Sequence, residues 1–359
     1  MNAAQRKGNI TSIDVARLAR VSQSAVSRSF TEGASVADST RQRVLAAAQQ
    51  LGYRPNAIAR ALTTNRSRII AVVVSNLHNQ FYPLVLETLS KRLQYEGYHV
   101  LLFITDTEDA DDLLVELLAY QVDGIVMAST TLSSGLASQI ADARIPIVMF
   151  NRTSRAGSIS TVSSDNYDGG RMVGHFLAGG GHGRIAYLAG TEDSSTNLDR
   201  ERGFVDGLGE RGLKLAMRAV GDYDFLCAAQ AARALFMRKR PPDAVFVASD
   251  HMAFAVMDTL RFELGLRIPE DVSVVGFDNA PPSAWGAYQL TTVEQSAGPM
   301  IEATVAMLMQ QLDDDAVSRD HVVVPVRLVT RRSARMPSGT GEPPAAKTAT
   351  RTGVSRTQR

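Results

Sequence analysis

The chain has 359 residues, of which 45% are hydrophobic and 21% are charged, as in a globular protein of two or three domains. Its single cysteine, Cys227, excludes an internal disulfide and favours a reducing compartment, so we expect a cytoplasmic protein. The first residues contain no apolar signal-peptide core, and no run approaches the ~20 apolar residues of a membrane span.

The net charge of +1 conceals an uneven distribution. Residues 1–68 carry 11 Lys and Arg against 3 Asp and Glu, and residues 335–359 carry 5 against 1, so the remainder is strongly acidic. A basic N-terminal segment on an acidic body predicts that this segment alone meets a polyanion such as DNA. A solvated basic tail is the alternative.

Residues 11–53 have the pattern of three short helices. Ser12 is the expected N-cap of the first helix, and Ser22 that of the second, residues 23–30. The third helix is expected to begin at Asp38 or Ser39 and to end at Gly52. Its apolar face would comprise Val44, Leu45, Ala48 and Leu51.

The second of these helices exposes polar side chains and buries apolar ones. Ala25, Val26 and Phe30 are the expected buried residues. The exposed set is Gln23, Ser24, Ser27 and Arg28. Glutamine, serine and arginine hydrogen-bond base edges in the major groove, which favours DNA binding over a purely structural three-helix unit.

A short helical segment follows, from Arg54 to Leu62. Pro55 suits the first helical position, but about two turns are too few for a stable isolated helix. A plain linker with helical propensity is the alternative.

The rest of the chain up to residue 334 alternates short apolar runs with amphipathic stretches. The expected strands are Ile69–Ser75, His99–Thr105, Gly124–Ala128, Ile147–Phe150, Ile185–Ala189, Ala244–Ala248, Val272–Phe277, Leu290–Gln295 and Val322–Val329. The expected helices are Pro83–Glu96, Asp111–Tyr120, Gly170–Ala178, Leu198–Glu210, Met252–Leu264 and Gly298–Leu312. This alternation predicts parallel sheets covered on both faces, and the series restarts near Ser164, which indicates two doubly wound subdomains.

Polar and aromatic side chains at the carboxyl ends of these strands are the candidate ligand contacts. They are Phe81, Tyr82, Asp165, Asp168, Arg200, Tyr223, Ser249, Asp250, Asp278 and Gln295. Arg200 and Asp278 suit hydroxyls or a carboxylate, and Tyr223 suits a ring. Each has a structural alternative, because an Asp after a strand often caps the next helix and the aromatic residues can simply pack between subdomains.

Other apparent motifs carry no chemistry. The run Gly179–Gly183 follows a helix and precedes a strand, the reverse of a phosphate-binding loop, so it is expected to be a helix end and turn. The six histidines lack metal-ligand spacing, and no nucleophile motif occurs, so we expect neither a metal nor a cofactor nor an enzyme.

Motifs spread over almost the whole chain resemble the lac repressor/purine repressor family. The head has I-D-V-A-x-x-A-x-V-S-x-x-x-V-S-R from Ile13, followed by L-G-Y-x-P-N at residues 51–56. The body has Asp123-Gly124-Ile125, Asp165-Asn166-x-x-Gly169, Arg200-x-x-Gly203-Phe204, Ser249-Asp250-x-Met252-Ala253 and Val274-Val275-Gly276-Phe277-Asp278. The order and spacing of these motifs together make the resemblance specific.

The resemblance implies a homodimeric repressor whose second helix lies in the major groove of a palindromic operator. Gln23, Ser24 and Arg28 would reach bases, and Ser12, Ser22 and Ser27 would contact phosphates. The segment with Asn56, Ala59 and Leu62 would be a hinge helix that folds on the operator, where Leu62 wedges a minor-groove base step.

The resemblance also implies an effector cleft between two periplasmic-binding-protein-like subdomains. Its ligand is expected to be a small metabolite such as a sugar or sugar derivative, and binding would change the angle between the subdomains. A periplasmic-type sugar-binding protein is the competing function, against which the basic head argues.

These inferences define an α/β chain in four parts. A helix-turn-helix head spans 1–53, a hinge 54–68, the effector-binding and dimerisation body 69–334, and a disordered tail 335–359. The first subdomain is expected at about 69–164 and 296–320, and the second at about 165–295 and 321–334.

One residue departs from the family pattern. Arg20 stands where the family has glycine, in the turn between the first two helices. If that turn requires a positive φ, arginine costs about 1 kcal/mol relative to glycine.

Overall fold

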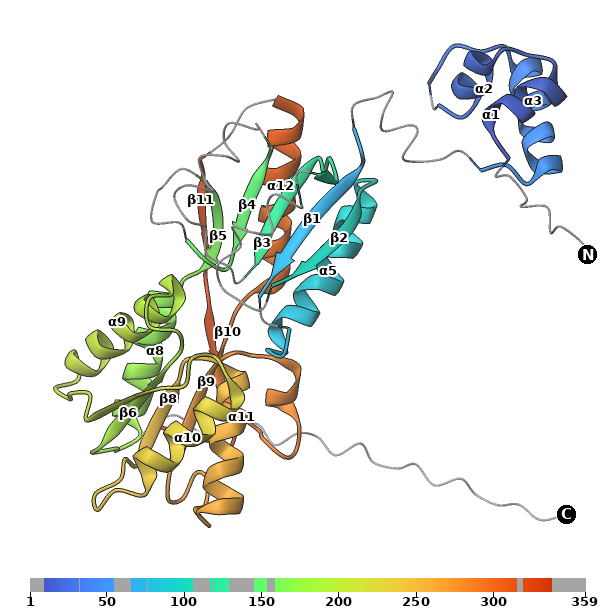
Figure 1. Ribbon diagram of the computed structural model, residues 1–359. Coiled ribbons are helices and arrows are strands. Elements are labelled where there is room, and N and C mark those ends of the chain that lie inside the picture. Colours follow the sequence, from blue (N-terminus) through green and yellow to red (C-terminus); the bar gives the residue numbers. More distant parts are fainter. Residues whose placement is uncertain are drawn as a thin grey trace, which may run out of the picture. The chain divides into compact units, whose positions relative to one another are not determined.

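The fold is described here from a computed structural model. It covers residues 10–31, 33–54, 66–75, 77–105, 117, 119–128, 145–153, 159–314 and 319–337. The chain divides into two compact units, Met1–Arg68 and Ile69–Arg359 (Figure 1). The predicted hinge residues Asn56, Ala59 and Leu62, most of the helix expected at 111–120, and the tail beyond residue 337 lie outside the described residues.

The first unit contains the three predicted helices, α1 (Ser12–Ala19), α2 (Gln23–Ser29) and α3 (Asp38–Leu51). They enclose a small core in which Val15, Val26 and Val44 are almost completely buried. The prediction for α3 was wrong at Leu45, which is 39% exposed. Ala47 is buried instead, because the contacts with α1 and α2 select the face of α3 that carries small side chains.

The start of α1 also differs from the prediction. Thr11, not Ser12, is the N-cap. The Asp14 carboxylate accepts hydrogen bonds from both the Thr11 backbone N–H, at 3.0 Å, and the Thr11 hydroxyl, at 2.8 Å. Acidic residues in a first helical turn also complement the helix dipole, so this arrangement outcompetes a Ser12 cap.

The second unit holds two six-stranded sheets, which confirms the predicted α/β architecture. The first sheet has the order β11-β5-β4-β3-β1-β2, and its strands pair in parallel throughout the described residues. Its strands are β1 (Ile69–Val74), β2 (His99–Ile104), β3 (Gly124–Ala128), β4 (Ile147–Phe150), β5 (Ser160–Ser164) and β11 (His321–Val324). The serine-rich β5 was not predicted, because its polar side chains are buried against neighbours and mask the apolar signal.

Both faces of the first sheet are buried, as continuous apolar strands require. Along β1, Ile70, Val72 and Val74 face the core beneath α5 (Phe81–Tyr95) and α12 (Ala297–Asp314), while Ala71 and Val73 face a separate core on the other side. Figure 1 shows α5 and α12 beside this sheet. Phe81 and Tyr82 are the first residues of α5, the helix that follows the carboxyl end of β1 in the chain.

The second sheet has the order β12-β10-β9-β8-β6-β7. Its strands are β6 (Ile185–Ala189), β7 (Met217–Val220), β8 (Ala244–Val247), β9 (Ser273–Asp278), β10 (Thr291–Glu294) and β12 (Arg327–Val329). Only β12 runs antiparallel among the described pairings. The helices of this subdomain are α8 (Asn166–Gly179), α9 (Ser195–Gly209), α10 (Phe225–Phe236) and α11 (Asp250–Asp258), which continues as a π-helical turn, Thr259–Glu263.

The predicted strand Val322–Val329 is divided between the two sheets. Residues 321–324 pair with β5 of the first sheet, whereas residues 327–329 pair with β10 of the second. Pro325 lies at the crossing, where its missing N–H would interrupt a continuous ladder. The first subdomain thus extends to residue 324 rather than to about 320.

Helices α8 and α9 pack backbone against backbone. A methyl group on Gly203 would overlap the Tyr167 carbonyl oxygen, and one on Gly170 would overlap that of Arg200. Glycine spaced four residues apart, at 170 and 174 and again at 203 and 207, keeps this contact on one face of each helix. The close approach sets Arg200 of α9 against Asn166 of α8, with Nε donating to Oδ1 at 2.8 Å.

Candidate DNA-reading surface and effector site

Helix α2 presents the predicted polar residues to solvent. Ser22, Gln23, Ser24, Ser27 and Arg28 are all exposed, while Val26 is 1% exposed and anchors the helix in the core. Ser22 caps the helix, since its Oγ accepts from the Ala25 backbone N–H at 3.2 Å. The surface therefore carries donors and acceptors on a rigid, capped helix.

Two of these side chains, Gln23 and Arg28, are held by their neighbours. The Gln23 amide donates to Ser12 Oγ at 3.0 Å, which assigns Ser12 to this surface instead of to the cap. Arg28 Nε donates to the Ser24 carbonyl at 3.4 Å. Among the described residues, neither Nη group of Arg28 has a hydrogen-bond acceptor, so the planar end of the guanidinium is available for a bidentate contact.

The turn before α2 is left-handed. Arg20 has φ 52° and ψ 52°, and the Val21 N–H bonds back to the Ala16 carbonyl at 3.0 Å, as in a Schellman-type helix end. The condition stated from the sequence, a positive φ at residue 20, is therefore met.

Replacing Arg20 with glycine should stabilise the head. Arg20→Gly removes the cost of an arginine in the left-handed region, so we expect an increase of about 1 kcal/mol in the unfolding free energy. Thermal unfolding of the full chain, followed by a probe in the head, measures it. Lower stability in this variant would contradict the account of the turn.

In the second unit, Asp278 connects three elements. It ends β9 with φ 129°, and its carboxylate is 4% exposed. Oδ1 accepts from Gln295 Nε2 at 2.6 Å, and Oδ2 accepts from Asn79 Nδ2 of the other subdomain at 3.4 Å. Gln295 Oε1 in turn accepts from Ser164 Oγ at 2.9 Å. Asp278 thus bridges the two subdomains through its hydrogen bonds.

Arg200 is the cation nearest to Asp278. Its Nη1 lies 3.7 Å from Asp278 Oδ1 and donates to the Ala248 carbonyl, and its guanidinium carbon is 3.7 Å from the centre of the Phe277 ring. The side chain is 2% exposed. A buried cation in such a setting is fixed in orientation by several partners, which suits it to ligand recognition.

The aromatic candidates Tyr82 and Tyr223 each contact a polar side chain through the phenol oxygen. Tyr82 Oη accepts from Asn151 Nδ2 at 3.3 Å, and Tyr223 Oη lies 3.1 Å from Thr196 Oγ1. The Tyr223 ring covers Gly190, where a side chain would overlap it. Burial raises the pKa of the Tyr82 phenol, and the positive charge of Arg152 opposes that rise.

Four remaining predicted residues have structural partners. Asp165 Oδ1 caps α8 by accepting from the Asp168 N–H at 2.9 Å, Asp168 lies 3.6 Å from Arg171, and Ser249 Oγ caps α11. The fully buried Asp250 accepts from the Ala280 N–H at 2.8 Å and from Thr292 Oγ1 at 2.6 Å. These contacts give each of the four side chains a structural role.

Five further buried polar residues of the body were not among the predicted site residues. They are Asn79, Asn151, Arg152, Thr196 and Asn197. Asn151 and Arg152 directly follow β4, so the rule applied to Asp278 could have identified them. Thr153 N–H donates to Ser195 Oγ at 3.1 Å, a further bond between the subdomains.

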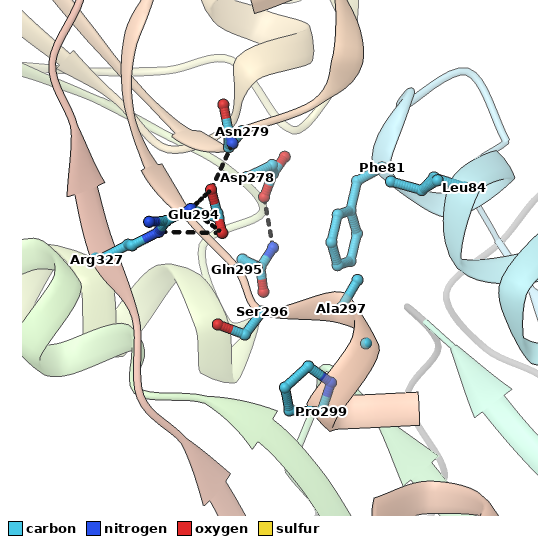
Figure 2. A pocket seen from close by; sticks show the side chains of 11 residues that line it. Phe81, Leu84, Asp278, Asn279, Glu294, Gln295, Ser296, Ala297, Pro299 and Arg327 are labelled. Carbon is cyan, nitrogen blue, oxygen red and sulfur yellow. Dashed lines mark hydrogen bonds and ion pairs between the residues drawn. The ribbon is translucent and has the colours of Figure 1, made fainter. Parts of the chain in front are cut away.

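An open cavity of about 580 Å³ lies beside Asp278, on the side of the segments that cross between the subdomains. Figure 2 shows Phe81 facing Gln295 and Ala297 across it, with the Glu294–Arg327 ion pair, 3.0 Å, on the opposite wall. Of the ten predicted effector residues, Phe81, Asp278 and Gln295 line this cavity. Arg200 and Tyr223 do not line it.

The buried Asp250 and Asp278 predict a pH dependence of stability. Burial raises the pKa of Asp250 to about 8, helped by the charge of Asp278, and burial raises that of Asp278 to about 6 against the opposing charge of Arg200. Because the folded state holds these protons more tightly than the unfolded state, their stabilising contribution is present at acid pH and is lost as pH rises towards 8.

Asp250→Asn should flatten this dependence. Its neutral amide resembles the protonated carboxyl and can keep the contact with the Ala280 N–H through Oδ1, while the Thr292 hydroxyl, which donates to the wild-type carboxyl, would turn to accept from the amide. Between pH 6 and 8.5 the unfolding free energy of the wild type should fall by up to about 1.4 kcal/mol per pH unit for each proton that the folded state holds in excess of the unfolded state. The unfolding free energy of the variant should fall less. Thermal unfolding across this range measures both slopes, and equal slopes would contradict the assignment of the proton to Asp250.

Comparison with known proteins defines the class. Residues 12–56 match the model of bacterial regulatory proteins of the lacI family, and residues 173–334 match a periplasmic binding protein-like domain. The chain therefore combines a DNA-binding head with a ligand-binding body. No helix among the described residues is long and apolar enough to cross a membrane.

Similar proteins span nearly the full length. Catabolite control protein A of Priestia megaterium is 29% identical, over 91% of this chain and 100% of the relative. The transcriptional repressor PurR of Vibrio vulnificus is 30% identical, over 84% and 91%. The lac repressor dimer bound to operator and the anti-inducer ONPF is 28% identical with a TM-score of 0.80, over 91% and 99%.

This protein belongs to the lacI family of bacterial regulatory proteins, and it is a ligand-responsive transcriptional regulator. The relatives named above are regulators rather than enzymes. The match of the head to the family model disfavours the competing function of a periplasmic sugar-binding protein.

Proposed function

We propose that this protein is a homodimeric repressor that binds a palindromic operator and is switched by a small metabolite in the cleft between its two subdomains. The observation that carries the proposal is the combination, in one chain, of an exposed polar α2 and a cleft with buried ionisable groups from both subdomains. The solved lac repressor dimer with operator and anti-inducer supports the same pairing of activities.

On DNA, α2 would lie in the major groove, where Arg28 forms a bidentate contact with a guanine and Gln23 and Ser24 contact neighbouring bases. The Ser12–Gln23 hydrogen bond supports this arrangement because it orients the glutamine amide. Ser22 and Ser27 would contact phosphates. In this proposal residues 54–68, with Asn56, Ala59 and Leu62, form the hinge in the minor groove.

In the body, we assign effector contacts to Arg200, Tyr223, Asp278 and Gln295 at the centre of the cleft, with Phe81 and Tyr82 from the first subdomain. The bonds Asn79–Asp278 and Thr153–Ser195 join the two subdomains without a ligand. An effector that replaces or strengthens these bonds would change the angle between subdomains. It acts on DNA only if it binds the two states unequally. The polar and aromatic side chains of these residues favour a sugar or sugar derivative, and a solved relative is a cellobiose complex.

Operator selection tests the DNA-reading proposal. The full chain is used to select sites from a random DNA library, and Arg28→Ala is then compared on the same library. Loss of the guanine contact should cost about 1–3 kcal/mol at one position of each half-site and relax the sequence preference there. Arg17→Ala, an exposed arginine of α1 that pairs with Asp14, is the matched control. An unchanged preference in Arg28→Ala refutes its role.

A further inference from the structure

The segment that follows β12 is bonded into the second sheet. Residues 331–337, which we call the C-terminal strap, include Ser333 and Ala334, and both of these residues are buried. The Ser333 carbonyl accepts from the Val274 N–H at 2.8 Å, and its hydroxyl oxygen accepts from the Thr291 N–H at 2.8 Å. The strap is therefore held by both β9 and β10.

The turn between α8 and β6 places a histidine against this strap. The side chain of His182 is completely buried. A methyl group on Gly180 would lie 3.1 Å from the Arg335 carbonyl oxygen and 3.1 Å from Cδ2 of the His182 ring. One on Gly179, in the same turn, would lie 3.0 Å from Pro337 Cβ. The histidine ring and the strap thus pack on the same side of this glycine-rich turn.

Neither nitrogen of the His182 ring has a hydrogen-bond partner among the described residues. The charged groups that face it are Asp243, from the segment before β8, and Arg335, from the strap. Asp243 Oδ1 lies 3.7 Å from His182 Nδ1, but this carboxylate already accepts from the Gly183 and Arg184 N–H groups, at 3.1 and 3.0 Å. Burial lowers the pKa of the imidazole, and the charge of Asp243 opposes this lowering whereas that of Arg335 adds to it.

A neutral imidazole suits this enclosed position better than an imidazolium. Protonation would bury a second cation near Arg335, at a site that gives neither ring nitrogen an acceptor among the described residues. If the strap moved away, water would reach the ring, and the imidazole would take up a proton at about pH 6.5, as an exposed histidine does. Because the released form binds the proton more tightly, acid favours release of the strap.

We propose that His182 is an acid-sensitive latch for the C-terminal strap, which stays docked while the imidazole is neutral and is released when the imidazole is protonated. This inference does not depend on the proposed repressor function. The strap begins at Arg331, whose Nη2 donates to Asn279 Oδ1 at 2.6 Å, so its release would remove a contact from the residue beside Asp278. The direction is opposite to that for Asp250, whose stabilising contribution is lost as pH rises.

Hydrogen exchange in the full-length protein tests the latch. Mass spectrometry follows the exchange between about pH 5 and pH 7.5, with the intrinsic exchange rate corrected at each pH. Below about pH 6.5, protection of residues 331–337 and of the Thr291 N–H should fall by up to about tenfold per pH unit, while β3 keeps its protection. Protection of the strap that does not change with pH, or that falls only in step with β3, overturns the proposal.

Two variants assign the effect to the histidine. His182→Gln removes the titrating ring and should make protection of the strap independent of pH in this range. His182→Leu is the second variant if glutamine disturbs the fold, since it replaces a ring without hydrogen bonds by an apolar side chain. His99→Gln removes an exposed histidine of β2 and, as the matched control, should retain the wild-type pH dependence. A wild-type pH dependence in both His182 variants would contradict the assignment.

Discussion

Gly203→Ala is expected to destabilise the body strongly. The added methyl group would overlap the Tyr167 carbonyl oxygen, which belongs to the α8 backbone and can move only if the two helices separate. Overpacking of this kind costs about 1–3 kcal/mol or more, so we expect the melting temperature of the body to fall by about 5 °C or more. In Gly170→Ala the added methyl group would overlap the Arg200 carbonyl oxygen, so this variant should also lower the melting temperature of the body.

Gly209→Ala supplies the matched control, because it lies at the end of the same helix and its added methyl group would contact nothing within 4 Å. It should be neutral or slightly stabilising. Thermal unfolding of the three variants measures the difference. Equal melting temperatures for Gly203→Ala and Gly209→Ala would show that α8 and α9 are not in backbone contact.

Asp278→Ala is expected to abolish the effector response while leaving operator binding without effector intact. The carboxylate contacts Gln295 of the crossing segment, Asn79 of the first subdomain and Arg200 of the second, so its loss uncouples the cleft from the subdomain angle. Removing one partner of a buried charge pair costs about 2–5 kcal/mol, which corresponds to roughly 30-fold to several-thousand-fold in effector affinity.

Operator titrations with and without the metabolite identified in a thermal-shift panel measure this response. Asp278→Asn, which preserves the shape of the side chain, separates loss of charge from loss of packing. Asp271→Ala is a control for removal of an exposed carboxylate, because Asp271 pairs only with Arg267 at the surface among the described residues. A normal response in Asp278→Ala would leave Asp278 as a structural residue.

Much of the fold could be predicted from the sequence because its strands are continuously apolar. The bounds of Gly124–Ala128, Ile147–Phe150 and Ile185–Ala189 were predicted without error. The half-exposed strand Met217–Val220 and the buried, serine-rich strand Ser160–Ser164 were missed, because tertiary pairing forms these strands without an apolar run. The helix Phe225–Phe236 was also missed, although Asp224 caps it.

The site was predictable only where a polar residue ends a strand. Asp278 was predicted on this basis, and the same rule would have added Asn151 and Arg152 to Phe81 and Tyr82 as candidates from the first subdomain. Asn79 and Asn197 could not be predicted, because their roles depend on contacts that only the fold creates. Asn79 bonds to Asp278, which is 199 positions away in the sequence, and Asn197 bonds to Tyr187, which is 10 positions away. At Arg20 the family pattern of glycine pointed to the question of a positive φ, and the structure shows that the residue is left-handed.

The central claim is that one chain couples sequence-specific DNA binding to occupancy of the cleft. It is tested most directly by titrating the full-length protein onto its selected operator with and without the metabolite found by thermal shift, and by determining the stoichiometry. The account predicts two chains per palindromic site and a change in operator affinity of about 5-fold to 150-fold on adding the metabolite, the usual range of allosteric coupling. Selection of no palindrome, or an operator affinity unchanged by a metabolite that demonstrably fills the cleft, would contradict it.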